Sequence, residues 1–286
     1  MTELRCRHRH KQKTHPMCFE RKGAEPPVDS PNVLVYDIET STATYKTYPR
    51  TGKVWLNPSW MTEKPYMLGW SGKWLLDTEV HSSFVSPEEA VKRDDERVTR
   101  ELHRMIDRAD YVITYNGNRF DNKEITSRFL KYGLTPTKYQ SIDLYQKVKQ
   151  ICRLPGYSLR YVLKEFGLSP KGDRVDTDKA EEGDAEALKK DEAYCKQDVL
   201  SEEELYVFLR PHMKTHPSMS VLMDRYTPLE EDEAYCPRCT GVVHIWRWEK
   251  RYAMPSGNMH KATNCPHCRS VIYKAERLHE QQIIKS

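Results

Sequence analysis

Short apolar runs that end in polar or charged residues recur along the chain, and they predict the strands of a buried sheet. The first run, VLVYDIE over 33–39, is rich in β-branched residues and ends in two carboxylates. A second run, YVITY over 111–115, precedes the turn residues Asn-Gly-Asn, and a short strand is expected around Ile142 and Leu144. Between the first two, Ser71-Gly72 separates YMLGW from KWLLDTEV, which predicts a hairpin beside the first strand.

Helical periodicity predicts four helices among these strands. They are expected over 86–107, from the Asn-Gly-Asn turn to Lys131, over 158–168, and from about residue 184 to 209. Ser86 is the expected N-cap of the first, with Glu88 and Glu89 in its first turn, and Gly167 is expected to end the third. Strands first, followed by alternating helix and strand, predict an α/β fold with a mixed sheet and helices on its faces.

The chain of 286 residues fits one catalytic domain with small appendages. Residues 1–31 form a basic Cys/His segment and a proline-containing linker, 32–212 form the α/β domain, and 230–286 form a cysteine-framed module. No apolar run approaches the roughly 18–20 residues of a membrane span, and the basic N-terminus lacks the apolar stretch of a secretory signal. We therefore expect a cytoplasmic protein without membrane contact.

Charge is distributed unevenly. Residues 1–22 carry seven Lys/Arg and two acidic residues, and 236–286 carry nine and three, whereas 23–235 carry 30 and 37. An acidic middle with basic ends suits a metal-carboxylate centre flanked by phosphate-binding surfaces, so a nucleic acid is the expected partner. Ordinary solvated surface charge is the alternative.

Four carboxylates and a tyrosine form the candidate active centre: Asp37, Glu39, Asp121, Asp198 and Tyr194. The period of a strand places the first two on one face at the end of a buried run, where two charges are costly without a cation. Asp121 follows a strand and a turn, where it could also cap the next helix. Tyr194 and Asp198 are four residues apart, so they share a helix face that could equally be a solvated surface.

Those residue types suit hard divalent cations. Mg²⁺ and Mn²⁺ prefer oxygen ligands, and two such ions roughly 3.5–4 Å apart can activate a water and stabilise a leaving 3′ oxygen. Asp37, Glu39, Asp121 and Asp198 are the expected ligands, with Tyr194 beside them and a water between. The set predicts a phosphodiesterase site.

Three segments carry a family resemblance. VYDIET, YNGNRFD and YCKQD resemble the motifs of the DEDD 3′–5′ exonucleases with a tyrosine in the third motif, a group of the ribonuclease-H-like superfamily that includes the proofreading domains of family B DNA polymerases. The resemblance covers roughly residues 33–210. The chain also resembles stand-alone phage and bacterial exonucleases, some of which carry a C-terminal zinc ribbon.

This resemblance implies a ribonuclease-H-like fold and a metal-dependent 3′–5′ exonuclease that acts on single-stranded DNA ends. It assigns Asp37, Glu39, Asp121 and Asp198 as metal ligands and Tyr194 as the residue that hydrogen-bonds the attacking water. It also places Asn116 and Phe120 against the terminal nucleotide. The setting would be DNA replication or repair in a bacterial cell or a phage-infected host, with a replication protein as a further partner. A 3′–5′ exoribonuclease is the alternative within enzymes. A nucleic-acid-binding replication or repair accessory protein is the alternative of another class.

The cysteines point to metal rather than disulfides. Cys236-x2-Cys239 and Cys265-x2-Cys268 are separated by 25 residues, a spacing that predicts a structural Zn²⁺ in a zinc ribbon. Such a small module depends on the ion for its fold. Cys152 and Cys195 have no near cysteine partner and are expected to be small buried apolar residues.

The basic N-terminus contains a second candidate zinc site. Cys6, His10, His15 and Cys18 have the spacing C-x3-H-x4-H-x2-C, in which His10 is preferred over His8 because Cys6-x-His8 is sterically tight. A disordered basic tail is the alternative.

Overall fold

The computed structural model describes residues 32–48, 56–75, 77–135, 138–169, 177–213, 216–217, 233–238, 241–244, 250–253, 259–267 and 269–275. The chain divides into two compact units. One comprises residues 32–149 and 154–205, and the other comprises residues 1–31, 150–153 and 206–286.

The first unit is built on a five-stranded sheet in the order β5-β4-β1-β6-β7. Its strands are β1 (Val33–Thr40), β4 (Met67–Trp74), β5 (His81–Phe84), β6 (Tyr111–Thr114) and β7 (Gln140–Asp143). Strand β4 pairs antiparallel with β1 and β5, whereas β6 pairs parallel with β1 and β7. The expected mixed sheet is confirmed.

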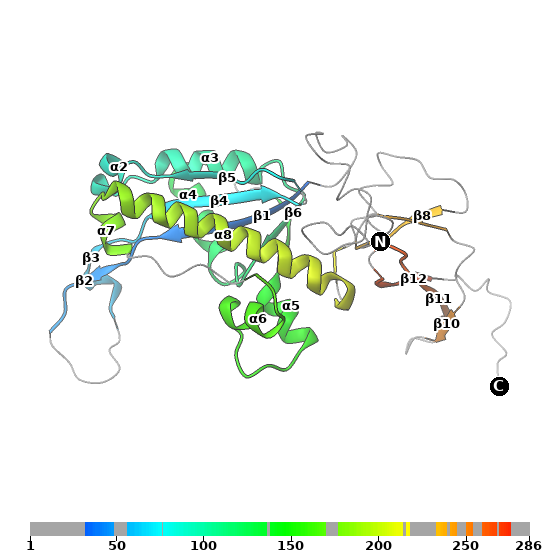
Figure 1. The fold of residues 1–286 in the computed structure, drawn as a ribbon. Coiled ribbons are helices and arrows are strands. Elements are labelled where there is room, and N and C mark those ends of the chain that lie inside the picture. Colours follow the sequence, from blue (N-terminus) through cyan, green and yellow to red (C-terminus); the bar gives the residue numbers. More distant parts are fainter. Residues whose placement is uncertain are drawn as a thin grey trace, which may run out of the picture. The chain divides into compact units, whose positions relative to one another are not determined.

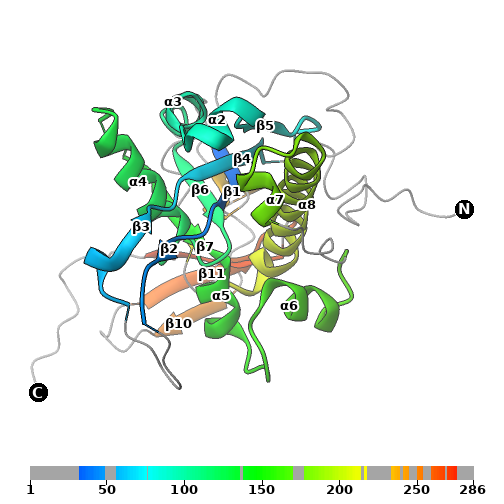
Figure 2. The ribbon, with the colours of Figure 1, turned by 90° about the vertical axis from the view of Figure 1, so that its left-hand side faces the viewer.

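Helices flank this sheet. They are α2 (Pro87–Lys92), α3 (Glu96–Ile106), α4 (Asp121–Lys131), α5 (Leu144–Ile151), α6 (Leu159–Glu165), α7 (Thr177–Glu181) and α8 (Ala185–Leu209). Figure 1 shows α8 running the length of the sheet, and Figure 2 shows the sheet between α4 on one side and α8 on the other. A small excursion after β1 holds β2 (Thr44–Tyr45), the 3-10 helix η1 (Pro58–Trp60) and β3 (Met61–Glu63).

Strand β1 shows why the two faces differ. Leu34, Tyr36 and Ile38 belong to the core cluster that includes α3 and α4 residues, and the Tyr36 hydroxyl donates to Asn122 Oδ1 of α4 at 2.6 Å. Since strand side chains alternate, Asp37 and Glu39 point to the opposite face, toward α8. The strand therefore buries one face in apolar packing and presents its carboxylates on the other.

The hairpin predicted at Ser71-Gly72 is wrong. Strand β4 runs through both residues without a turn, and Gly72 pairs with Tyr36 in β1. A Cβ atom at Gly72 would lie 3.3 Å from Leu34 Cδ1, and one at Gly69 would lie 2.3 Å from Phe84 Cγ. The glycines allow close packing within a strand, and the turn comes later, between β4 and β5.

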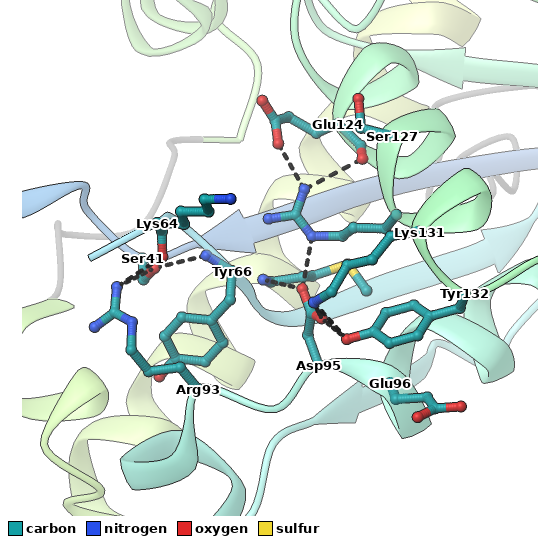
Figure 3. Close-up of polar contacts among 12 residues, drawn as sticks. Ser41, Lys64, Tyr66, Arg93, Asp95, Glu96, Glu124, Ser127, Lys131 and Tyr132 are labelled. Atoms are coloured by element: carbon teal, nitrogen blue, oxygen red, sulfur yellow. Dashed lines mark hydrogen bonds and ion pairs between the residues drawn. The ribbon is translucent and has the colours of Figure 1, made fainter. Parts of the chain in front are cut away.

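The single helix predicted over 86–107 is two helices. Ser86 caps α2 as predicted, and it forms a complete capping box with Glu89. Arg93, however, adopts left-handed φ/ψ (φ 53°), and α3 begins at Glu96. The Arg93 guanidinium donates to Ser41 Oγ, Thr42 O and Lys64 O. These contacts hold the break against the segment that follows β1 (Figure 3).

Asp95 anchors the start of α3. Its buried carboxylate accepts from the Met67 amide (2.9 Å), Arg128 Nε (2.8 Å), Lys131 Nζ (3.0 Å) and the Tyr132 hydroxyl. Figure 3 shows these donors converging from α4 and β4 on the one carboxylate. The buried charge is thus surrounded by donors, which joins α3 to α4 and to the sheet.

In the second unit the described elements are the 3-10 helix η2 (Arg210–His212) and the strands β8 (Glu233–Tyr235), β9 (Val242–His244), β10 (Lys250–Ala253), β11 (Met259–Asn264) and β12 (Val271–Ala275). Strands β8 and β9 form one antiparallel pair, and β10, β11 and β12 form an antiparallel sheet. Among the helices of the described ranges, none has the length and apolar character needed to span a membrane.

Candidate metal centre

Asp37 and Glu39 lie together at the end of β1, on the face that α8 covers. A ligand atom from each carboxylate and the Cys195 Sγ atom of α8 all lie within 4.8 Å of one another. The Cys195 thiol approaches the Asp37 Oδ2 and backbone O atoms at 3.5 Å. The first strand and the long helix therefore meet at this acidic pair.

Asp121 joins the same strand end from α4. Its buried carboxylate accepts a hydrogen bond from the Ile38 backbone amide, between the two acidic residues of β1. This amide is accessible to a side chain because the parallel pairing of β1 with β6 stops at Val35–Ile113. Asp121 is also the first residue of α4. A position at the start of the helix, which was the alternative interpretation, is therefore compatible with a position beside Asp37 and Glu39.

The charge environment of Asp121 indicates a cation site. Burial, with a smaller effect from the nearby carboxylates of Asp143 and Glu124, raises the pKa of Asp121 to about 7. A carboxyl in this position is costly to ionise unless a positive charge is close. A divalent cation would supply that charge.

Asp198 is the candidate carboxylate on α8. Its side chain is buried, and its charge acts on the Cys195 thiol together with those of Asp37 and Glu39. Asp198 on α8 is thus near Cys195, which contacts Asp37, and Asp121 on α4 bonds the Ile38 amide that lies between Asp37 and Glu39 in β1. Tyr194 lies one turn before Asp198 on the same helix and is partly exposed.

The donor set fits a hard cation. Burial raises the pKa of the Cys195 thiol well above its usual value, and the charges of Asp37, Glu39 and Asp198 raise it further. The thiol therefore stays protonated and is a poor metal ligand, because the thiolate is the form that binds metals. The remaining donors are carboxylate oxygens, which suit Mg²⁺ or Mn²⁺.

Asn116 and Phe120 belong to the loop between β6 and α4, next to Asp121. Asn116 has a positive φ of 68°, and Phe120 is 42% exposed. Asp143, at the end of β7, holds this loop: its Oδ1 atom accepts from the Asn116 amide at 3.0 Å and its Oδ2 atom from the Asn118 amide at 3.2 Å. The loop is fixed by a buried side chain, and Phe120 remains open to solvent.

Sequence reasoning missed the roles of two residues. Cys195 is buried as predicted, but its thiol also contacts Asp37, and its i, i+3 spacing to Asp198 placed both on one helix face. Asp143 is the last residue of β7, and an acidic residue within the short strand predicted around Ile142 and Leu144 was the available signal. Cys195 thus contacts one of the candidate carboxylates, and Asp143 holds the loop that precedes Asp121.

The cysteine module shows two matching turns. The Cys236 amide donates to Gly241 O, and the Cys265 amide donates to Ser270 O, each at 2.9 Å and each spanning five residues. The turns contact each other, since His267 Nε2 lies 2.9 Å from Val242 O and a Cβ atom at Gly241 would lie 2.3 Å from the His267 ring. Cys236 and Cys265 are both buried. Cys239, Cys268 and the N-terminal set of Cys6, His10, His15 and Cys18 lie outside the described residues.

Comparison with known proteins identifies the domain that carries the acidic set. Residues 71–210 match the family model RNase_H_2, described as RNase_H superfamily. These residues form an RNase H-like superfamily domain. The matched range of this RNase H-like domain contains Asp121, Tyr194 and Asp198, and β1 with Asp37 and Glu39 pairs with its first matched strand.

Solved structures give a wider comparison. Among 165 matching chains is the family B DNA polymerase from the hyperthermophilic archaeon Pyrobaculum calidifontis, with 19% identity and a TM-score of 0.47. The match covers 71% of this chain and 28% of the polymerase, so the chain spans about 28% of that protein's length. No curated protein matches the chain significantly.

Proposed function

We propose that the RNase H-like domain is a metal-dependent 3′–5′ exonuclease that hydrolyses phosphodiester bonds at single-stranded DNA ends. The observation that carries this proposal is the convergence of acidic residues from three segments: Asp37 and Glu39 on β1, Asp121 at the start of α4, and Asp198 on α8. The membership of residues 71–210 in the RNase H superfamily supports hydrolysis of a nucleic acid. The resemblance of the three motifs to tyrosine-type DEDD exonucleases supports the direction of cleavage.

In this proposal Asp37, Glu39, Asp121 and Asp198 hold two Mg²⁺ or Mn²⁺ ions. When bound, such ions lower the pKa of a water and stabilise the charge on the leaving oxygen. Tyr194 hydrogen-bonds the attacking water and fixes its direction. The water adds to phosphorus, the bond from phosphorus to the 3′ oxygen breaks, and a 5′-mononucleotide leaves.

Asn116 and Phe120 are proposed to hold the terminal nucleotide. Phe120 presents an exposed aromatic ring beside Asp121, which suits packing against a base. The rigid attachment of the loop to Asp143 supports a fixed position for that nucleotide relative to the acidic set.

The cysteine module is proposed to be a zinc ribbon. The two matching five-residue turns, each with a buried cysteine at its start, support a site in which Cys236, Cys239, Cys265 and Cys268 bind one structural Zn²⁺. A second Zn²⁺ at Cys6, His10, His15 and Cys18 remains a proposal from sequence spacing.

The decisive experiment uses 5′-labelled single-stranded DNA and RNA of identical sequence, incubated with the protein in Mg²⁺, Mn²⁺ or EDTA. The expected result is a ladder that shortens from the 3′ end of DNA with either metal, and an intact strand in EDTA. A ladder with RNA alone would establish the exoribonuclease alternative instead. Hydrolysis that persists in EDTA would refute the metal-dependent mechanism.

A further inference from the structure

A cluster of aromatic and basic side chains lies on the segments that follow β6 and β7. These are the segments that lead to Asp121 and that follow Asp143. The Tyr115 and Tyr145 rings meet edge to face at 5.9 Å between centroids, and the Tyr145 and Tyr157 rings at 6.2 Å. Lys149 Nζ lies 5.2 Å from the centroid of Tyr145 and 5.4 Å from that of Tyr157. We call Tyr115, Tyr145, Tyr157 and Lys149 the tyrosine–lysine cluster.

The cluster is held together from within the first unit. The Tyr115 hydroxyl donates to Tyr157 O at 2.5 Å, and the Tyr157 hydroxyl accepts from the Leu154 amide at 3.0 Å. Tyr145 and Tyr157 are partly exposed, and Lys149 is exposed. The rings therefore have fixed positions, while the cation and part of the aromatic surface face solvent.

The position of the cluster follows from the chain. Tyr115 directly precedes Asn116, and Tyr145 comes two residues after Asp143, the residue that holds the 116–118 backbone. The cluster thus begins where the loop proposed to hold the terminal nucleotide begins. A strand with its 3′ end at Asp121 would pass this surface if it left the site along α5.

The local charge around the tyrosine–lysine cluster indicates the kind of ligand that it would bind. Residues 144–164 contain five basic residues and no acidic residue, although residues 23–235 as a whole contain 30 basic and 37 acidic ones. Within an acidic part of the chain this segment is locally cationic, so it suits a polyanion. Exposed aromatic rings next to a lysine are the features that bind single strands, through base stacking and backbone charge.

We propose that the tyrosine–lysine cluster is a binding site for single-stranded nucleic acid, which takes the bases and phosphates that lie 5′ of the terminal nucleotide. This inference rests on the proposed exonuclease function and extends it to the nucleotides that are not being cleaved. Tyr145 stacks on a base and Lys149 neutralises a phosphate. Both contacts are independent of base identity, so they suit an enzyme that shortens strands of any sequence.

The test measures binding without hydrolysis. Fluorescence anisotropy with a labelled 12-mer of oligothymidine or oligouridine, in buffer without Mg²⁺ or Mn²⁺, gives Kd at several salt concentrations for the full chain. Lys149→Glu is expected to weaken binding and to reduce the slope of log Kd against log salt by about 0.7 or more. Tyr145→Leu is expected to weaken it about tenfold, whereas Tyr145→Phe retains the ring and leaves Kd unchanged.

The matched control is Lys92→Glu, the same charge reversal at an exposed lysine of α2. Figures 1 and 2 show α2 above the sheet and α5 below it, so this control lies far from the cluster. Equal losses for Lys149→Glu and Lys92→Glu would overturn the proposal, as would unchanged binding by both Lys149→Glu and Tyr145→Leu. A loss with either single strand supports it. Because binding is measured without Mg²⁺ or Mn²⁺, it does not depend on hydrolysis. An inactive exonuclease could still show the effect of Lys149→Glu on binding, and an active exonuclease could lack it.

Discussion

The Lys73 Nζ atom lies 2.5 Å from the Glu203 Oε1 atom, and both side chains are 1% exposed. The pair joins β4 to α8, the helix that carries Tyr194 and Asp198. Removal of one member of such a pair leaves a buried charge without its counter-charge. The ion pair therefore fixes the position of α8 against the sheet.

Lys73→Met is expected to lower the free energy of unfolding by about 3–5 kcal/mol. The double variant Lys73→Met/Glu203→Leu is expected to recover most of that loss, because the buried charge is then absent. Urea unfolding followed by circular dichroism measures both. Lys189→Met, which removes one member of the exposed Lys189–Glu186 pair, is the control and is expected to leave the unfolding midpoint unchanged. A double variant as unstable as the single would contradict this account.

Asp198→Asn and Tyr194→Phe separate ligand binding from water orientation. Asp198→Asn is expected to abolish hydrolysis, since a carboxylate is lost from the cation site. Tyr194→Phe is expected to lower kcat about 100-fold with KM nearly unchanged, because one hydrogen bond to the water is lost. Single-turnover assays on labelled oligonucleotide measure both, and full activity of Asp198→Asn would refute the site.

The raised pKa of Asp121 predicts how stability depends on pH in metal-free protein. Burial, together with the nearby carboxylates, raises this pKa from 3.8 to about 7, whereas the unfolded chain ionises near the ordinary value. From about pH 4 to pH 7 the folded state keeps a proton that the unfolded state releases. The free energy of unfolding in EDTA is therefore expected to fall as pH rises through this window, by up to about 1.4 kcal/mol per pH unit.

Two comparisons isolate Asp121 as the source of that slope. Mn²⁺ added at pH 8 is expected to raise the thermal midpoint, because the cation favours the ionised carboxylate. Asp121→Asn is expected to flatten the pH dependence in EDTA. The same slope in Asp121→Asn as in the parent protein would show that another group is responsible.

Asp143→Asn tests the attachment of the 116–120 loop. Asparagine offers one carbonyl oxygen in place of two carboxylate oxygens, so the Asn116 or the Asn118 amide loses its acceptor. KM for single-stranded DNA is expected to rise about tenfold while kcat changes little, since the acidic set itself is intact. Asp178→Asn on the exposed side of α7 is the matched control. A collapse of kcat alone would place Asp143 in the chemistry rather than in positioning.

Zinc removal tests the cysteine module. Elemental analysis is expected to give at least one Zn²⁺ per chain, and Cys236→Ser is expected to lose it because one of four ligands is weakened. Cys152→Ser is the control, since that cysteine lies outside the two turns and is expected to leave the zinc content unchanged. Zinc content unaffected by Cys236→Ser would exclude this ligand set.

Much of the fold was predictable because its signals are local. The apolar run of β1, the Ser86 capping box and the long helix with Tyr194 and Asp198 all appear in the structure. Ser71-Gly72 misled because a glycine that permits close strand packing has the same sequence signature as a turn glycine. The break at Arg93 was invisible because its cause is the contact with Ser41 and Lys64, distant in sequence.

The residues of the candidate site also divide into those that local sequence could identify and those that it could not. The acidic residues could be selected from strand ends and helix spacing, which follow from the chain alone. Asp143 and Cys195 could not be assigned, because their roles depend on which backbone amide or carboxylate lies opposite them. Tertiary neighbours, rather than local pattern, determine those roles.

The hydrogen bond from Ile38 to Asp121 couples the main chain of the sheet to the electrostatic state of the site. The amide proton of Ile38 bonds to a side chain instead of the neighbouring strand β6, so its chemical shift is sensitive to the charge of that carboxylate. Magnetic resonance of this single nucleus would therefore register the arrival of a diamagnetic cation directly. The Ile38 amide of β1 is thus a built-in spectroscopic probe for cation binding at Asp121.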